Sequence, residues 1–177
     1  ANLVFTRMLS GPMDFTPGIL SLKGRDGLAM QSTLAKQLAN YVVIYSPVQM
    51  AADLAEHYQQ NLRAFQFIKD VPTDWEQTRV LNGEIGDFVT IARQERGGKN
   101  WFLGSVTDEH GRVLTLTLDF LDPKKRYTAQ IYRDGADADF RRNPSDFVVE
   151  SRSLSFSDVL TLRLAPGGGA AIRFVEN

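Results

Sequence analysis

The feature that most constrains this chain is a change in hydrophobic period close to residue 75. Before that point apolar residues recur at helical spacing, and after it they alternate at the two-residue spacing of strands. This pattern predicts an α+β chain in which a helical segment precedes an all-β domain. The boundary is expected between Val71 and Trp75, which divides the 177 residues into segments 1–74 and 75–177.

The strongest helical pattern runs over residues 31–46. One face carries Leu34, Leu38, Tyr41, Val42 and Tyr45, flanked by the small residues Ala35 and Ala39. Pro47 is expected to end or kink this helix, and residues 48–58 can continue it after the break. Residues 64–69 suit one further turn.

A short strand is expected upstream of that helix. Residues 3–8 suit a short helix that ends at Gly11-Pro12, and residues 13–16 then form a strand candidate before Pro17-Gly18. One strand followed by a long helix is half of a repeating βα unit, so the chain is expected to begin inside a larger domain. Apolar helix faces left open in this way predict self-association or dependence on a missing portion.

The second half predicts about eight short strands separated by turn residues. Their spacing, without intervening helices, favours an antiparallel sandwich or Greek key. The expected strands are 79–82, 88–93, 101–107, 113–118, 127–132, 147–151, 159–164 and 171–175.

Composition excludes several classes of partner and site. The formal net charge is -1 and like charges form no long run, which argues against nucleic acid and anionic membranes. The longest apolar stretch, residues 41–45, is far below the ~20 residues of a membrane span. Without cysteine there is neither a disulfide framework nor a thiolate metal site.

Three stretches carry a resemblance to a known family. They are residues 5–18 (FTRMLSGPMDFTPG), residues 37–53 (QLANYVVIYSPVQMAAD), and residues 70–76 (DVPTDWE) with 79–87 (RVLNGEIGD). In these stretches the chain resembles the C-terminal end of glycoside hydrolase family 97. The resemblance covers essentially the whole chain.

The resemblance implies the last βα unit of a (β/α)8 barrel, followed by the C-terminal β-domain that packs against it. Members are exo-acting α-glucosidases or α-galactosidases, mostly bacterial and often periplasmic, so α-linked oligosaccharides and a periplasmic or secreted location are expected. The remaining partners are the rest of the barrel and an N-terminal β-domain. The family's catalytic carboxylates fall upstream of Ala1, which leaves retention or inversion open and predicts an inactive fragment. No cofactor or metal is expected here, although an inverting parent would bind calcium through upstream ligands.

Two residues are candidates for substrate binding. Asp14 is expected near the C-terminal end of a barrel strand, where such enzymes build their sites; the alternative is a carboxylate that accepts hydrogen bonds in the following turn. Trp75 lies between Asp74 and Glu76, a combination that suits a sugar ring, but it can equally fill the seam between the two segments.

Other polar groups have simpler explanations. Asp134, Asp137 and Asp139 lack the spacing of a calcium loop and are expected in a solvated loop. Glu84 and Asp87 fall in a connection between strands, where polar residues are expected. His57 and His110 each lack a second histidine at metal-ligand spacing. Residues 167–169 suit a hairpin turn. The alternative functions are an accessory carbohydrate-binding or structural β-domain, and a stand-alone partner-binding domain.

Overall fold

The structure is a computed structural model that describes residues 2–24 and 26–177. The helical elements are α1 (Asn2–Phe5), the 3-10 helix η1 (Arg7–Ser10), α2 (Leu34–Val43), α3 (Ala55–Gln60) and α4 (Leu62–Asp70). The strands are β1 (Trp75–Glu84), β2 (Phe88–Glu95), β3 (Trp101–Thr107), β4 (Arg112–Thr117), β5 (Arg126–Asp134), β6 (Phe147–Ser155), β7 (Val159–Leu164) and β8 (Gly169–Glu176). Among these helices, none combines the length and hydropathy needed to cross a membrane.

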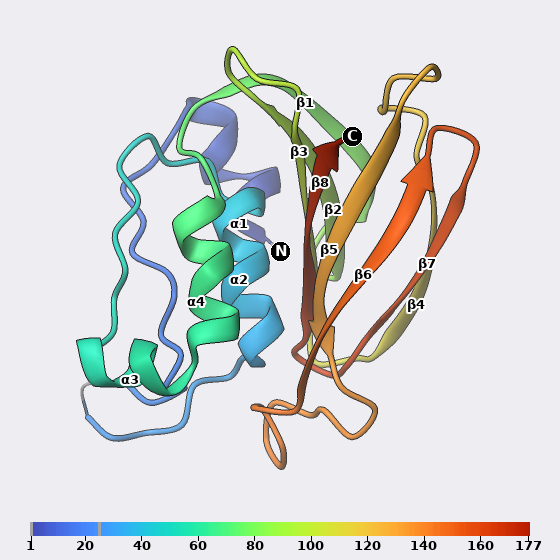
Figure 1. The fold of residues 1–177 in the computed structure, drawn as a ribbon. Coiled ribbons are helices and arrows are strands. Elements are labelled where there is room, and N and C mark those ends of the chain that lie inside the picture. The colour runs from blue at the N-terminus through green and yellow to red at the C-terminus, as the bar shows by residue number, and fades with distance from the viewer. Residues whose placement is uncertain (1, 25) are drawn as a thin grey trace.

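The strands form two antiparallel sheets. Six strands pair in the order β1-β2-β3-β8-β5-β6, and β4 pairs with β7 in a separate two-stranded sheet. Helices α2 and α4 lie on one face of the larger sheet, and the smaller sheet covers the other face (Figure 1). These pairings confirm the predicted antiparallel β-domain. It could be predicted because regular alternation of apolar and polar residues determines which side of each strand is buried.

Two apolar cores lie on the two faces of the larger sheet. One core joins α2 and α4 to the sheet through residues such as Leu38, Val42 and Phe67. The other fills the sandwich between the sheets, with the leucines of β4 and β7 against Ile172 and Phe174 of β8. The helical segment and the β-domain thus share a continuous apolar core.

Helix α2 approaches the sheet closely because Gly104 of β3 has no side chain. A Cβ atom at this position would lie 2.6 Å from the carbonyl oxygen of Ala39 and 2.9 Å from Cγ2 of Val43. Ala39 itself is fully buried. The predicted close packing along the small residues of this helix therefore occurs, with glycine on the sheet side.

The predicted continuation of this helix after Pro47 is wrong for residues 48–54 and correct for residues 55–58, which belong to α3. The helix is capped at its start by the side chain of Thr33, which accepts from the backbone N–H of Lys36 at 3.3 Å. It ends at Val43, and Nε2 of Gln49 donates to the carbonyl oxygens of Tyr41 at 2.9 Å and Ile44 at 3.2 Å. The Gln49 side chain thus satisfies two carbonyls at the end of the helix, and residues 44–54 form no helix before α3 begins at Ala55.

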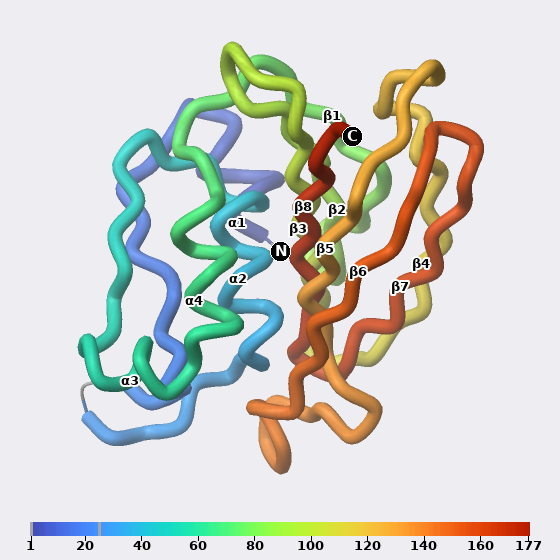
Figure 2. Tube along the Cα trace, in the orientation of Figure 1, coloured from blue at the N-terminus to red at the C-terminus, as the bar shows by residue number. Residues whose placement is uncertain are grey.

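The strand expected at residues 13–16 is reduced to one parallel bridge between Phe15 and Gln49. The two extended segments around this bridge run along the side of the helices that faces away from the sheet (Figure 2). The glycine turn at residues 167–169 is also not a hairpin, since it connects β7 to β8 in the other sheet. Gly167 adopts a φ of 66°, which favours glycine.

Candidate functional site

Asp14 lies on the open side of the helical layer. Its side chain is exposed and lines a pocket of about 320 Å³ together with Pro12, Met13, Val48 and Met50. In the described part of the chain its carboxylate has no hydrogen-bond partner. The turn-capping alternative therefore has no support in the structure, and a role in sugar binding stays a prediction.

Trp75 lies in the seam between the helices and the sheet. Its side chain is buried and packs edge-on against Phe102, with ring centroids 5.8 Å apart. The neighbouring carboxylates of Asp74 and Glu76 bind the guanidinium of Arg96 at 2.7 and 3.3 Å. This placement fits the seam role, and contact with a sugar stays a prediction.

A carboxylate–imidazole pair lies beside a cavity of about 610 Å³. Oδ1 of Asp53 lies 2.5 Å from Nδ1 of His57, and its Oδ2 accepts the backbone N–H of Ser21 at 2.6 Å. Burial opposes ionisation of Asp53, but the hydrogen bonds from Ser21, His57 and Leu54 outweigh it and lower the pKa. The pair anchors the start of α3 to the preceding loop.

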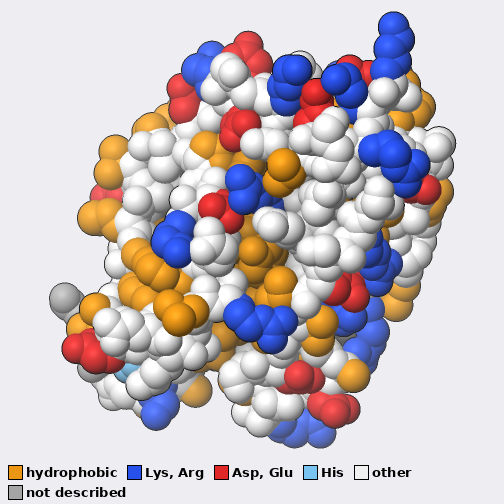
Figure 3. Space-filling model, in the orientation of Figure 1, with side chains coloured by type: hydrophobic (Ala, Val, Ile, Leu, Met, Phe, Trp, Pro, Cys, Tyr) orange, Lys and Arg blue, Asp and Glu red, His pale blue; other side chains and the backbone are white. Residues whose placement is uncertain are grey.

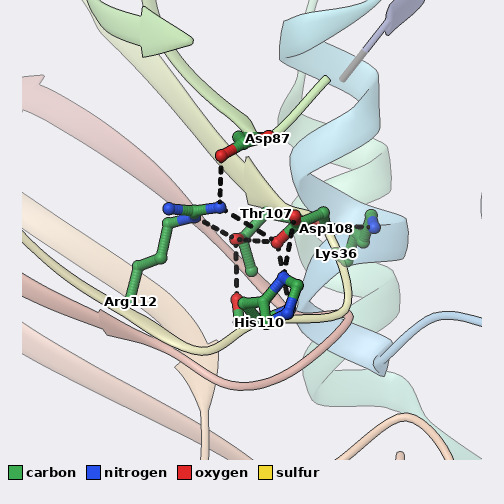
Figure 4. A network of polar contacts seen from close by, with 6 residues as sticks. All are labelled: Lys36, Asp87, Thr107, Asp108, His110 and Arg112. Atoms are coloured by element: carbon green, nitrogen blue, oxygen red, sulfur yellow. Dashed lines mark hydrogen bonds and ion pairs between the residues drawn. The ribbon is translucent and has the colours of Figure 1, made fainter. Parts of the chain in front are cut away.

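The densest polar network surrounds the β3–β4 turn (Figure 4). The guanidinium of Arg112 bonds Asp87 at 3.0 Å, Asp108 at 3.2 Å and the hydroxyl of Thr107 at 2.9 Å. Lys36 of α2 donates to the carbonyl oxygen of Thr107 at 2.7 Å. The β3–β4 turn is therefore bonded both to helix α2 and to the connection between β1 and β2.

The ionisation of this network follows from its geometry. Burial acts against the charge of Asp108, but the backbone and ring N–H groups of His110, with Arg112, lower its pKa to about 2. The Nδ1 atom of His110 lies 3.1 Å from Asp108, and this carboxylate raises the pKa of His110. Burial lowers the pKa of Lys36.

Asp108, Glu109 and His110 also lie close enough to share a metal ion. However, both carboxylate oxygens of Asp108 are already bound, one by Arg112 and the backbone N–H of His110, the other by the His110 ring. A cation would have to displace these contacts and would face the positive charge of Arg112. The arrangement fits a structural ion-pair network better than a metal centre.

Asp134 has a role that its sequence context does not predict. This residue is 2% exposed, whereas a solvated loop was predicted, and its Oδ2 accepts the backbone N–H groups of Ala165 and Gly169 at 2.9 Å each. Burial raises the pKa of Asp134. The first of these N–H groups belongs to Ala165, which is 31 residues away in sequence, so no local sequence pattern predicts that Asp134 accepts it. Asp137, by contrast, is exposed as expected.

The arrangement of acids limits what the chain can do chemically. Hydrolysis of a glycosidic bond requires two carboxyl groups that face each other across the bond. The pocket beside Asp14 contains one carboxyl, and the cavity beside Asp53 contains one. A third pocket, of about 410 Å³, is lined by Asp122 and Glu176, but Glu176 is bound in ion pairs to Lys99 and Lys125. Glu84 is exposed and Asp87 is bound to Arg112, so neither forms part of such a pair in the described residues.

Comparison with known proteins links these features to one family. The family model described as "Glycosyl-hydrolase 97 C-terminal, oligomerisation" matches residues 74–175. A retaining alpha-galactosidase of Bacteroides thetaiotaomicron is 34% identical over an alignment of 176 positions that covers 96% of this chain and 26% of that protein.

Solved structures give a similar result. A glycoside hydrolase family 97 enzyme of Pseudoalteromonas sp. strain K8, in complex with acarbose, is 53% identical with a TM-score of 0.96, over 99% of this chain and 28% of that one. A panose complex from the same strain has a TM-score of 0.95 and the same coverage. The chain thus spans about a quarter of the length of these relatives.

Proposed function

This chain belongs to the glycoside hydrolase 97 family through its C-terminal domain, and from that premise we propose that it is the C-terminal part of an exo-acting α-glycosidase. In this proposal segment 1–74 completes the catalytic barrel, and segment 75–177 is a β-domain that packs against the barrel's flank and supports oligomerisation. The chain is inactive by itself, because the acid and base belong to the upstream part.

The observation that carries the proposal is the parallel bridge between Phe15 and Gln49. Parallel strands require a crossover connection, and α2 lies between these two segments in sequence. The layers follow in the order extended segments, helices, sheet (Figure 2). In a (β/α)8 barrel the strands lie inside and the helices outside. We therefore infer that the two segments belong to the last barrel strands and that the β-domain packs on the outer helices.

The apolar surface of the helical side supports the same inference. Hydrophobic side chains gather over the helices and the neighbouring extended segments (Figure 3). Exposed fractions reach 79% for Leu9, 63% for Val48 and 50% for Met50. Surfaces of this kind mark an interface. In the proposal, the upstream barrel covers them.

The relatives favour an α-glucoside over an α-galactoside as the substrate. The 53% identical enzyme binds acarbose and panose, which is an α-linked glucose trisaccharide, whereas the named galactosidase is 34% identical. An α-galactosidase is the second candidate. The family also supports a periplasmic or secreted location, and any calcium ion would bind through upstream ligands.

The test compares the 177-residue chain with the longer polypeptide that includes the upstream barrel. We expect the longer protein to hydrolyse an aryl α-glucoside faster than an aryl α-galactoside, and the short chain to hydrolyse neither. Adding the separately expressed upstream part should restore turnover if the short chain completes the barrel. Turnover by the short chain alone would refute the proposal, because it would require a catalytic pair within these residues.

A further inference from the structure

The two-stranded sheet has an unusual outer face. Its exposed positions alternate with buried leucines along both strands. We call this surface the β4–β7 face; it consists of Val113, Thr115, Thr117, Val159, Thr161 and Arg163. Five of these six residues are β-branched and uncharged, and the two valines are 68% and 60% exposed.

Charge is scarce on the β4–β7 face. Arg163 is its one charged residue, and its Nη1 donates to the carbonyl oxygen of Ala136 at 2.9 Å. Strand β6, which is also at a sheet edge, instead carries Glu150 and Arg152, and Glu150 forms ion pairs with Arg152 and with Arg133 of β5. Exposed strands are normally protected by such charges, so the β4–β7 face lacks a common barrier to pairing.

The free edge of β4 is suited to strand addition. Within the described residues β4 pairs only with β7, through six consecutive pairs without a bulge, and it contains neither lysine nor proline. The competing edge at β1 is interrupted by two register shifts. At the β6 edge, Arg63 donates to the carbonyl oxygen of Val149 at 3.3 Å. The register shifts at β1 and the Arg63 contact at β6 impede pairing at those two edges. The other outer strand of the small sheet, β7, carries the charged Arg163, whereas residues 113–117 of β4 carry no charge.

The space beside β4 is open. A groove of about 340 Å³ lies between β4 and β1, and it is lined by Arg79 and Val80 on one side and by Thr115, Thr117 and Asp119 on the other. The sandwich therefore does not close its own edge on this side. An added strand has access to the backbone of β4.

We propose that a second copy of the chain docks here, with β4 pairing antiparallel to β4 of the copy about a two-fold axis. This inference rests on the proposed function, because the matching family is described by its oligomerisation. Both copies present the same patch in such an interface. The result is a continuous sheet in the order β7-β4-β4-β7.

The register follows from the alternation of side chains. Directly opposed residues of an antiparallel pair point to the same face, so their positions must have the same parity. The centred register places Thr115 opposite Thr115 and Val113 opposite Thr117. Buried leucines remain on the inner side in both copies, and the uncharged face extends across the two-fold axis.

The test uses a pair of charge variants at the predicted two-fold axis. In Thr115→Lys or Thr115→Glu, like charges oppose each other, so the dissociation constant should rise about a hundredfold or more. Mixing the two variants should restore association, because opposite charges then meet. Sedimentation velocity over a wide concentration range measures this, and circular dichroism checks that each variant remains folded.

Matched controls separate this face from the helical side. Ile85→Lys changes an equally exposed apolar residue in the β1–β2 turn, and it should leave association unchanged. Loss of association in Met50→Lys, with none in the Thr115 variants, would overturn the proposal. So would a monomeric wild-type chain at every concentration. Either result would leave the glycosidase assignment intact, because turnover of the longer polypeptide tests that separately.

Discussion

Arg93 of strand β2 donates from Nε to the carbonyl oxygen of Val42, at 2.7 Å, in the last turn of helix α2. The guanidinium also lies 5.5 Å from the ring centroid of Tyr45 and 6.0 Å from that of Trp75. No acidic side chain pairs with it in the described part of the chain. The negative end of the helix and two aromatic faces therefore compensate a buried cation. Burial lowers the pKa of Arg93 to about 10.

Replacement of Arg93 by alanine should lower the free energy of unfolding by about 2–4 kcal/mol, since it removes charged hydrogen bonds to helix carbonyls in a buried site. Arg93→Lys should recover only part of this loss, because an ammonium lacks the planar fork. Urea denaturation measures both changes. Arg79→Ala, on the exposed surface of β1, is the control, and equal losses in the two alanine variants would contradict the assignment.

Gly104→Ala should destabilise the chain by about 1–3 kcal/mol, because the added methyl overlaps the backbone of α2 and the packing must shift. Gly111→Ala is the milder comparison, since its Cβ would lie 3.3 Å from the carbonyl oxygen of Leu164 and should cost less than the 2.6 Å approach at Gly104. Thermal unfolding of both variants checks the expectation. A harmless Gly104→Ala would mean that α2 lies farther from the sheet than the structure places it.

The Asp108–His110 pair predicts a dependence on pH. The pKa of Asp108 lies near 2, below the usual value of 3.8, so its stabilising effect is present above pH 3.8 and is lost as the pH falls towards 2. The raised pKa of His110 acts oppositely: its contribution is complete below pH 6.5 and is lost as the pH rises through the folded value.

The variant Asp108→Asn tests this pair directly. Removal of the carboxylate should return the pKa of His110 towards 6.5, which NMR titration of the ring measures. The free energy of unfolding at neutral pH should fall by about 1 kcal/mol, reduced from the full linkage value because the site is partly solvated. Glu109→Gln is the comparison, since Glu109 makes a smaller contribution to the raised pKa of His110 and its removal should lower that pKa less. An unchanged His110 titration in Asp108→Asn would show that the two side chains do not interact in solution.

Asp134 should show the opposite dependence from Asp108. Its pKa is raised by burial, so the folded chain binds its proton more tightly than the unfolded chain. The stability contribution is therefore greatest in acid, and it falls as the pH rises from 3.8 through the folded pKa. Asp134→Asn keeps an acceptor oxygen and should remove this dependence.

Truncation at the same position should have a larger effect. Asp134→Ala leaves the backbone N–H groups of Ala165 and Gly169 without their acceptor, at a cost of about 1–3 kcal/mol for each unsatisfied group. Urea unfolding at several pH values distinguishes the two variants. If alanine and asparagine behave alike, the carboxylate oxygen does not serve these donors.

Much of the β-domain could be predicted because its signal is local. Alternation along residues 113–118 and 159–164 indicates which side of each strand is buried without any knowledge of its partner. The partners themselves were not accessible. Strand β7 pairs with β4 in a separate sheet and not with its sequence neighbours β6 and β8. This choice of partner depends on packing between segments far apart in sequence.

The end of α2 shows why the helical half was harder. Residues 48–58 have an acceptable helical pattern, yet only residues 55–58 are helical, and Gln49 instead binds the carbonyl oxygens of Tyr41 and Ile44. Similarly, the carboxylates of Asp108, Asp134 and Asp139 look alike in the sequence. Only the folded structure buries Asp134, which raises its pKa, and places His110 and Arg112 around Asp108, which lowers the pKa of that carboxyl.

The sequence by itself determined the strands of the sandwich, the amphipathic face of α2 and the family resemblance, because each is written in short-range spacing or in runs of matching residues. Only the tertiary structure decided the burial of Asp134, the Arg93–helix contact, the parallel bridge at Phe15 and the open edge of β4. These features depend on which distant segments meet, since burial and charge compensation are properties of contacts and not of residue types.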